Sequence, residues 1–263
     1  MKIAKVFLAA ALSLACMAGC KSQFEALLNS NDVDAKYTAA FKYFNEGKYK
    51  KAADLFESMS VLVSGTPQDD TVQFYRGMSN YRNKDYYTAE TNFKNFMDKF
   101  PRSPFTETAE FLRLDCLYKA TNRWALDQGP TYTAIVAINE YRMAHPTSVH
   151  TAICKRMLDD LNERLDRKAY EAAYLYYKME EYKSARVAFR NILKDDADNI
   201  YREKILYYTA MSSYKYANLS VRAKQKERYM VFVDDYFNFV GEYPESSYKK
   251  DLDDLYSKAK EKI

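Results

Sequence analysis

Apolar and small side chains recur at helical spacing from about residue 34 to the C-terminal end of the sequence. Five segments share one pattern, in which a small or aromatic residue precedes a large apolar residue by four positions on one helix face. The pairs are Ala52 and Phe56, Ala89 and Phe93, Ala134 and Ile138, Ala185 and Phe189, and Phe232 and Tyr236. Three segments are followed by a proline, Pro101, Pro146 or Pro244, which cannot continue a helix. The pattern predicts stacked helical hairpins.

The repeat period is irregular, which predicts insertions between the hairpins. An insertion is expected at 121–130, and one continuous helix is expected near 148–180, where apolar residues recur without a helix breaker. An amphipathic segment at 248–263 is expected to cap the array. The spacing of small, aromatic and proline positions resembles that of tetratricopeptide (TPR) repeats. We therefore predict an all-α, TPR-like α-solenoid of about five helical hairpins, with N-terminal repeats at 35–147 and the long helix and C-terminal repeats at 148–263.

The N-terminal segment has the layout of a secretory signal peptide. Two lysines precede a short apolar run, which is too short to span a bilayer, and small residues then precede Cys20. Ala18-Gly19-Cys20 resembles the lipobox of bacterial lipoproteins, which implies cleavage after residue 19, acylation of Cys20 and a polar tether at 20–34. Cys16 is a weaker candidate for the lipid attachment site. An ordinary signal peptide with an incidental cysteine is the alternative.

The composition disfavours β-rich folds, nucleic-acid-binding proteins and enzymes. Six Gly and six Pro in 263 residues, with no Asn-Gly or Asp-Gly pair, disfavour a β-rich fold. Without residues 1–19 the chain has 38 basic and 36 acidic side chains, a formal charge of +2 that is too balanced for a nucleic-acid-binding protein. No phosphate loop, nucleophile elbow or metal-ligand spacing is present, so we expect no enzymatic activity, no cofactor and no metal. Cys116 and Cys154 are expected to be buried free thiols, with a disulfide between them as the alternative.

The first helices of such an array line its concave side, and this side serves recognition in TPR-like proteins. Tyrosine, phenylalanine and methionine offer large contact areas there at little cost in rotamer entropy. We therefore predict a peptide-binding groove in the first two repeats, although packing between repeats is an alternative role for each ring. The groove positions are Tyr37, Phe41, Phe44, Asn45, Phe74, Met78, Tyr81 and Arg82. The equivalent positions of repeat 4 are Tyr170, Tyr174, Tyr177 and Lys178.

The order of these features resembles one family, the BamD family of outer membrane lipoproteins. The resemblance covers about residues 20–260. It rests on the lipobox, the five repeats, the Phe100-Pro101-Arg102-Ser103-Pro104 break, and His145-Pro146-Thr147-Ser148 leading into the long helix. Glu242-Tyr243-Pro244-Glu245-Ser246 repeats the same kind of break. The basic segment at 220–227 matches nothing in the family pattern.

The resemblance implies a scaffold of the β-barrel assembly (BAM) machinery on the periplasmic face of the outer membrane. The N-terminal repeats would bind C-terminal segments of unfolded outer membrane proteins. The C-terminal repeats would dock a BamA-like barrel subunit beside other BAM lipoproteins, with Lys194 at the docking position of repeat 4. A cation favoured by the helix C-terminus is the alternative explanation for Lys194. Alternative functions are another TPR lipoprotein adaptor, for pilus or cell-wall assembly, and a SusD-type glycan-binding lipoprotein.

Overall fold

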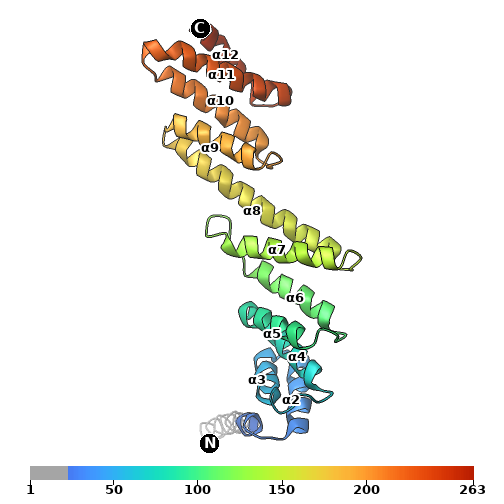
Figure 1. Cartoon of the computed structure of the whole chain (residues 1–263). Coiled ribbons are helices and arrows are strands. Elements are labelled where there is room, and N and C mark those ends of the chain that lie inside the picture. Colours follow the sequence, from blue (N-terminus) through green and yellow to red (C-terminus); the bar gives the residue numbers. More distant parts are fainter. Residues whose placement is uncertain (1–22) are drawn as a thin grey trace, which may run out of the picture. The chain divides into compact units, whose positions relative to one another are not determined.

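The computed structural model describes residues 23–263, in which all the regular structure is helical. Consecutive helices form hairpins, and a final helix follows them (Figure 1). The hairpins pair α2 (Val33–Asn45) with α3 (Tyr49–Met59), α4 (Asp69–Arg82) with α5 (Tyr86–Lys99), α6 (Thr106–Lys119) with α7 (Gly129–Ala144), α8 (Thr151–Lys178) with α9 (Tyr182–Asp195), and α10 (Arg202–Asn218) with α11 (Arg222–Glu242); α12 (Lys249–Lys260) ends the array. The predicted all-α, TPR-like fold is confirmed.

The chain divides into two compact units. The first comprises the chain up to Thr121 together with Gly129–Cys154, and the second comprises Asn122–Gln128 and Lys155–Ile263. Helix α8 begins in the first unit and continues through the second. Its bounds confirm the long helix expected near 148–180. In residues 23–263 no helix is both long and apolar enough to cross a membrane.

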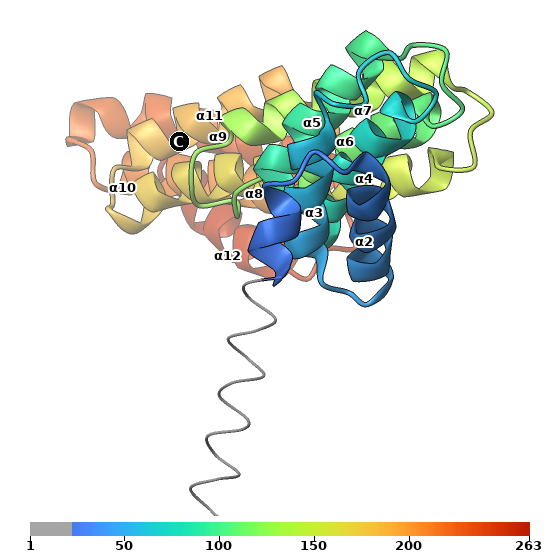
Figure 2. The ribbon, with the colours of Figure 1, turned by 90° about the horizontal axis from the view of Figure 1, so that it is seen from below.

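The predicted small and aromatic pairs form the core of the first unit. Helix α3 packs against both α2 and α4, and α5 packs against α4 and α6 (Figure 2). Ala52 and Phe56 on α3, like Ala89 and Phe93 on α5, are completely buried. Gly77 on α4 lies directly against Phe93, since a Cβ atom there would be 2.8 Å from the Phe93 ring. The small residue is therefore what lets these two helices approach closely.

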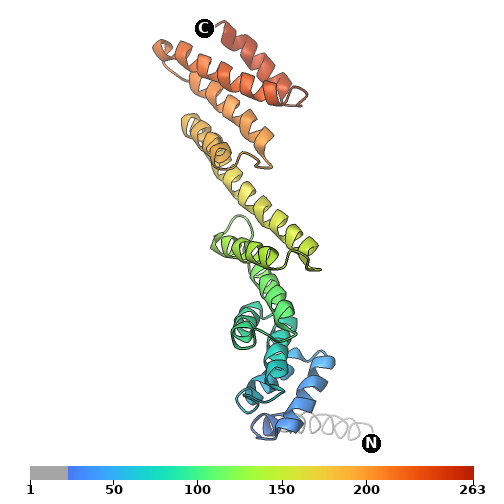
Figure 3. The same ribbon diagram turned by 45° about the vertical axis from the view of Figure 1, so that its right-hand side comes forward.

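The second unit uses the same packing and closes it with α12 (Figure 3). Ala185 and Phe189 of α9 are completely buried against α8 and α10. Phe232 and Phe239 of α11 pack in a core that includes Leu252 and Ala259 of α12. The expected cap helix is thus present, and its apolar face covers the last hairpin. Helices α5, α7 and α11 each end two residues before the expected proline, at Lys99, Ala144 and Glu242.

The segment expected to be a polar tether is partly ordered. Residues 23–28 are helical, and Phe24, Leu27 and Leu28 pack against the core formed by α2 and α3. Residues 23–28 of the expected tether at 20–34 are therefore packed, because these apolar residues at helical spacing have a surface to bury. Lys36, only 2% exposed, donates a hydrogen bond from Nζ to the Leu28 carbonyl oxygen at 2.9 Å and so caps this segment. The signal peptide and Cys20 lie outside the described residues.

Candidate interaction surfaces

The groove positions predicted on α2 lie in a continuous aromatic cluster of the first unit. Tyr37, Phe41 and Phe44 are partly buried, and Asn45 is exposed at the end of the helix. The Tyr37 and Phe41 rings are 4.8 Å apart, and Phe41 contacts the Tyr75 ring of α4 at 4.7 Å. The exposed edges of these rings form an apolar surface that a peptide side chain could contact.

The positions predicted on α4 divide into two kinds. Met78 and Tyr81 are partly buried, and Arg82 is exposed, with its guanidinium 5.4 Å from the centre of the Tyr49 ring. Phe74 is only 4% exposed and stacks on Phe105 at 4.5 Å. The ring of Phe74 therefore belongs to the core, because α6 begins beside it and covers it.

A polar cluster beside Tyr81 was not predicted from the sequence. The Tyr81 hydroxyl donates to the carboxylate of Asp115 on α6, and Lys119 Nζ donates to the Tyr81 oxygen at 2.7 Å. Burial, together with the bond to Asp115, raises the pKa of Tyr81. Burial alone would lower the pKa of Lys119, but its bonds to Asp115 and Tyr81 raise it above the usual value. The lysine therefore remains charged at neutral pH and forms an ion pair with Asp115 next to the aromatic surface.

One sequence signal points to this cluster. Tyr118-Lys119 at the end of α6 repeats the order of Tyr81-Arg82 at the end of α4. The same register therefore extends the groove positions into the third hairpin. Asp115 carries no such signal, because its role depends on how α4 and α6 pack.

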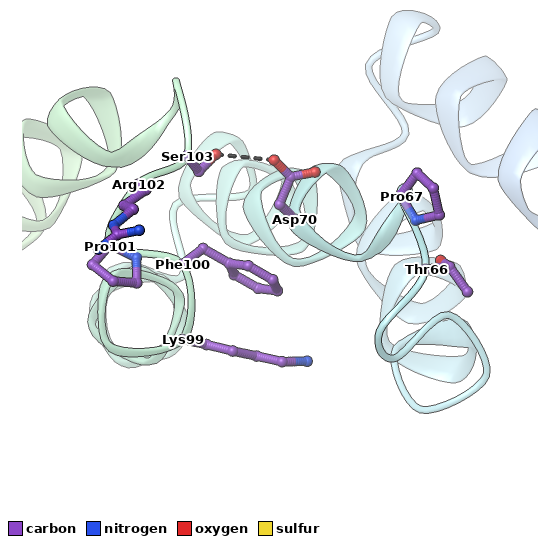
Figure 4. A pocket seen from close by; sticks show the side chains of 8 residues that line it. All are labelled: Thr66, Pro67, Asp70, Lys99, Phe100, Pro101, Arg102 and Ser103. Carbon is purple, nitrogen blue, oxygen red and sulfur yellow. Dashed lines mark hydrogen bonds between the residues drawn. The ribbon is translucent and has the colours of Figure 1, made fainter.

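The proline break after α5 lines a cavity of about 430 Å³ in the first unit (Figure 4). Lys99, Phe100, Pro101 and Arg102 form one wall, opposite Thr66 and Pro67. The Ser103 hydroxyl donates to Asp70 Oδ2 at 3.0 Å and joins the loop after α5 to the first turn of α4. The cavity combines an aromatic ring and prolines with two cations.

Lys194 lies in the last turn of α9, in the second unit, and is exposed. It lines a surface depression together with residues of α9, α10 and α11; the other lining residues are Arg190, Leu193, Leu206, Thr209, Asp235 and Asn238. Arg190, one helical turn before Lys194, is also exposed. The two cations therefore face the same depression.

An ion pair between the buried Asp235, which lines this depression, and the partly buried Arg186 lies beneath it. Arg186 donates two hydrogen bonds to Asp235 on α11, from Nε at 2.6 Å and from Nη2 at 3.0 Å. Asp235 is 6% exposed and also accepts a hydrogen bond from Ser213 of α10. The pair therefore fixes α9 against α10 and α11, and so fixes the positions from which Arg190 and Lys194 project.

The tyrosines predicted to face a groove in repeat 4 form a stack. Tyr170, Tyr174 and Tyr177 follow one another along α8, with adjacent rings stacked 5.8 and 6.0 Å apart. Tyr208 of α10 contacts all three rings. Burial raises the pKa of Tyr170 and Tyr177. The stack therefore joins α8 to α10, and Lys178 beside it is exposed.

Cys116 and Cys154 are both buried free thiols, in agreement with the favoured expectation. Burial raises the pKa of the Cys116 thiol to about 12, so the thiol is protonated and a poor nucleophile at neutral pH. Within residues 23–263, no group of three or more His, Cys, Asp or Glu side chains is arranged to hold a metal ion.

Comparison with known proteins identifies the family of the chain. The family model YfiO, described as an outer membrane lipoprotein, matches residues 29–231. The outer membrane protein assembly factor BamD of Caulobacter vibrioides is 20% identical over 192 residues, 72% of this chain and 63% of the relative. A putative outer membrane protein assembly factor BamD of Aquifex aeolicus is 25% identical over 206 residues, 76% of this chain and 64% of the relative. The chain thus spans less than two thirds of the length of these relatives.

Among solved structures, a thermophilic TPR protein of Thermus thermophilus has a TM-score of 0.33 and 14% identity, covering 86% of this chain and 98% of that one. The YfiO match is the stronger finding, because it includes every helix from α2 to α10 and the start of α11. The resemblance inferred from the repeats and the proline breaks is therefore confirmed. The chain belongs to the YfiO family of outer membrane lipoproteins, the family of BamD.

Proposed function

We propose that the protein is a non-enzymatic scaffold, lipid-anchored at Cys20 on the periplasmic face of the outer membrane, that assists the assembly of β-barrel outer membrane proteins. Membership of the YfiO family is the observation that carries this proposal, and the names of the two relatives support it. The stacked hairpins support it as well, because they present extended surfaces for polypeptides.

The second unit docks the central barrel subunit through the depression between α9, α10 and α11. Arg190 and Lys194 supply positive charge there, and Leu193 and Leu206 supply apolar contact. A partner with a carboxylate beside an apolar side chain fits this chemistry. The Arg186–Asp235 pair beneath it supports the role, since a rigid floor reduces the entropy lost on binding.

The first unit binds extended segments of unfolded substrate proteins. Tyr37, Phe41, Phe44, Met78 and Tyr81 offer partly exposed apolar surface, with Asn45 and Arg82 as polar groups at its edge. Phe74 supports this surface from the core, and the Lys119–Asp115 ion pair lies beside Tyr81 at its edge. An extended peptide that carries aromatic side chains and a terminal carboxylate is the ligand class that suits this set.

The test is affinity capture of the tagged protein from detergent-solubilised outer membranes. We expect the wild type to recover a barrel protein that has periplasmic domains. The variant Arg190→Glu/Lys194→Glu should recover at least about tenfold less of it, because two attractive charges become repulsive. The control Lys183→Glu/Lys250→Glu makes the same charge change at two exposed helix starts away from the depression and should behave like the wild type.

Two outcomes contradict the proposal. Recovery of cytoplasmic or inner-membrane proteins alone would remove the assembly role. Equal loss of capture in the control variant would remove the docking surface. Genetic depletion provides an independent measurement: loss of many barrel proteins is expected, whereas loss of a single appendage would assign the chain to a different adaptor.

A further inference from the structure

The turn between α10 and α11 concentrates the positive charge of the chain. Residues 215–228 contain five cations, Lys215, Arg222, Lys224, Lys226 and Arg228, and one acid, Glu227. Their net charge of +4 equals the formal charge of all 263 residues, so the remainder of the chain is neutral overall. The turn lies at one edge of the second unit, on the same edge as the α8–α9 turn (Figures 1 and 3).

Helix stability does not explain the cations at the start of α11, although it favours Lys215 in the last turn of α10. Arg222 and Lys224 lie in the first turn of α11, where the positive end of the helix dipole repels them, and no acid accompanies them there. Helix α4, in contrast, has Asp69 and Asp70 in its first turn. The side chains of Arg222, Lys224 and Lys226 are exposed, and no carboxylate among residues 23–263 forms an ion pair with them.

Two aliphatic side chains project from the same turn. Leu219 is 68% exposed and Val221 is 71% exposed. The backbone that carries them is held in place, because Gln225 Nε2 donates to the Ser220 carbonyl oxygen at 3.0 Å and to that of Asn218 at 3.3 Å. Tyr229 also donates to Asn218 Oδ1 at 3.2 Å. The turn is thus a fixed support for a pair of exposed aliphatic groups surrounded by cations.

We propose that this turn, residues 215–228, binds the headgroup region of an anionic lipid bilayer, with Leu219 and Val221 inserted between the headgroups. Lysines on flexible stems suit a headgroup layer, which requires no fixed geometry. The cores of protein interfaces, in contrast, are enriched in aromatic residues and depleted of lysine. The one tyrosine of the turn, Tyr216, lies under Arg228, and the adjoining Tyr229 is bonded to Asn218, so neither ring is free for a partner. Exposed lysines and aliphatic side chains, without a free aromatic ring, therefore favour an anionic lipid surface over an acidic protein.

The experiment is co-sedimentation, with lipid vesicles, of residues 20–263 carrying Cys20→Ala, which lack both the acyl anchor and the predicted signal peptide. One set of vesicles is neutral phosphatidylcholine, and the other has one third phosphatidylglycerol. We expect binding to the anionic vesicles that weakens as salt is added. Lys224→Gln/Lys226→Gln should reduce the partition coefficient by at least about tenfold. Leu219→Ser/Val221→Ser should also reduce it, without a change in the thermal melting curve.

The matched control is Lys250→Gln/Lys258→Gln, which removes two exposed lysines from α12 and should bind like the parent. Equal binding to neutral and anionic vesicles overturns the proposal, and so does equal loss in the control. Capture of polyglutamate by the turn, with no binding to vesicles, overturns it in favour of an acidic polypeptide. The assay contains no assembly partner, so its result is independent of the proposed function.

Discussion

At the residue scale, the turns between paired helices show how a few positions set the hairpin geometry. Gly47, Lys84 and Glu180 all have positive φ angles, of 74°, 63° and 62°. The backbone N–H of the following residue bonds back to the carbonyl oxygen of the residue five positions earlier, as in Lys48 to Tyr43 at 2.8 Å. This closure satisfies carbonyls at the helix end, and glycine adopts it without steric cost. Lys84 and Glu180 adopt it against their intrinsic preference.

We predict that Lys84→Gly and Glu180→Gly each increase the free energy of unfolding by up to about 1 kcal/mol, because glycine relieves the left-handed strain. Urea denaturation followed by circular dichroism measures the effect. Gly47→Ala at the equivalent turn is the control and should lose about 1 kcal/mol. A loss of stability in both glycine variants would show that side-chain contacts of Lys84 and Glu180 outweigh the backbone strain.

At the element scale, hairpin spacing depends on the small residue of each first helix. Gly77 brings α4 onto α5, because an added Cβ would be 2.8 Å from Cε1 and 3.0 Å from Cδ1 of Phe93. Phe93 is completely buried, so its ring has no free volume into which to move. Helix propensity favours alanine over glycine at position 77, whereas the contact with Phe93 favours glycine.

We predict that Gly77→Ala lowers the free energy of unfolding by about 1–3 kcal/mol, although alanine raises helix propensity by about 1 kcal/mol. Gly241→Ala on α11 is the control, because nothing lies within 4 Å of its added Cβ. It should be neutral or stabilising in the same denaturation experiment. Adding Phe93→Leu to Gly77→Ala should recover part of the loss, and strictly additive effects would contradict a clash between these two residues.

At the scale of the whole molecule, the proposed membrane attachment is through an acyl group on Cys20, which lies outside the described residues. No helix of residues 23–263 is both long and apolar enough to cross a membrane. The helical segment at 23–28 packs on the first core through Phe24, which is 5.7 Å from the Tyr43 ring. The proposed lipid at Cys20 is therefore within a few residues of a segment that packs on this core.

We predict that Cys20→Ala moves the protein into the soluble periplasmic fraction once membranes are washed in high salt. Removal of the acyl chains leaves only electrostatic and peripheral contacts, which salt weakens. Cell fractionation followed by immunoblotting measures the distribution, and the wild type in the same wash is the reference. Retention of the variant on washed membranes would place the anchor elsewhere in the chain.

Much of the fold was predictable from local pattern, because the repeat pairs are short-range signals. Ala89 and Phe93 lie one turn apart on one helix face, and that spacing is readable without knowing what covers them. The groove was less predictable. The repeat register predicted that both Phe74 and Tyr37 face the groove. In the structure Phe105 stacks on Phe74, whereas Tyr37 is only partly buried. No sequence pattern distinguished Asp115, because a single acid on a helix is usually a solvated surface residue. Its role depends on the Tyr81 hydroxyl, which donates to it from another helix.

The sequence by itself determined the helices, their pairing, the prolines that end them and the family, since each depends on residues within about one helical turn or on their order along the chain. Only the tertiary structure decided which aromatic side chains are packed and which keep free surface. It also decided that 23–28 joins the core and that Arg190 and Lys194 face a depression above the Arg186–Asp235 ion pair. The physical reason is that burial and pairing depend on the neighbouring helix, whose contacting residues are distant in sequence.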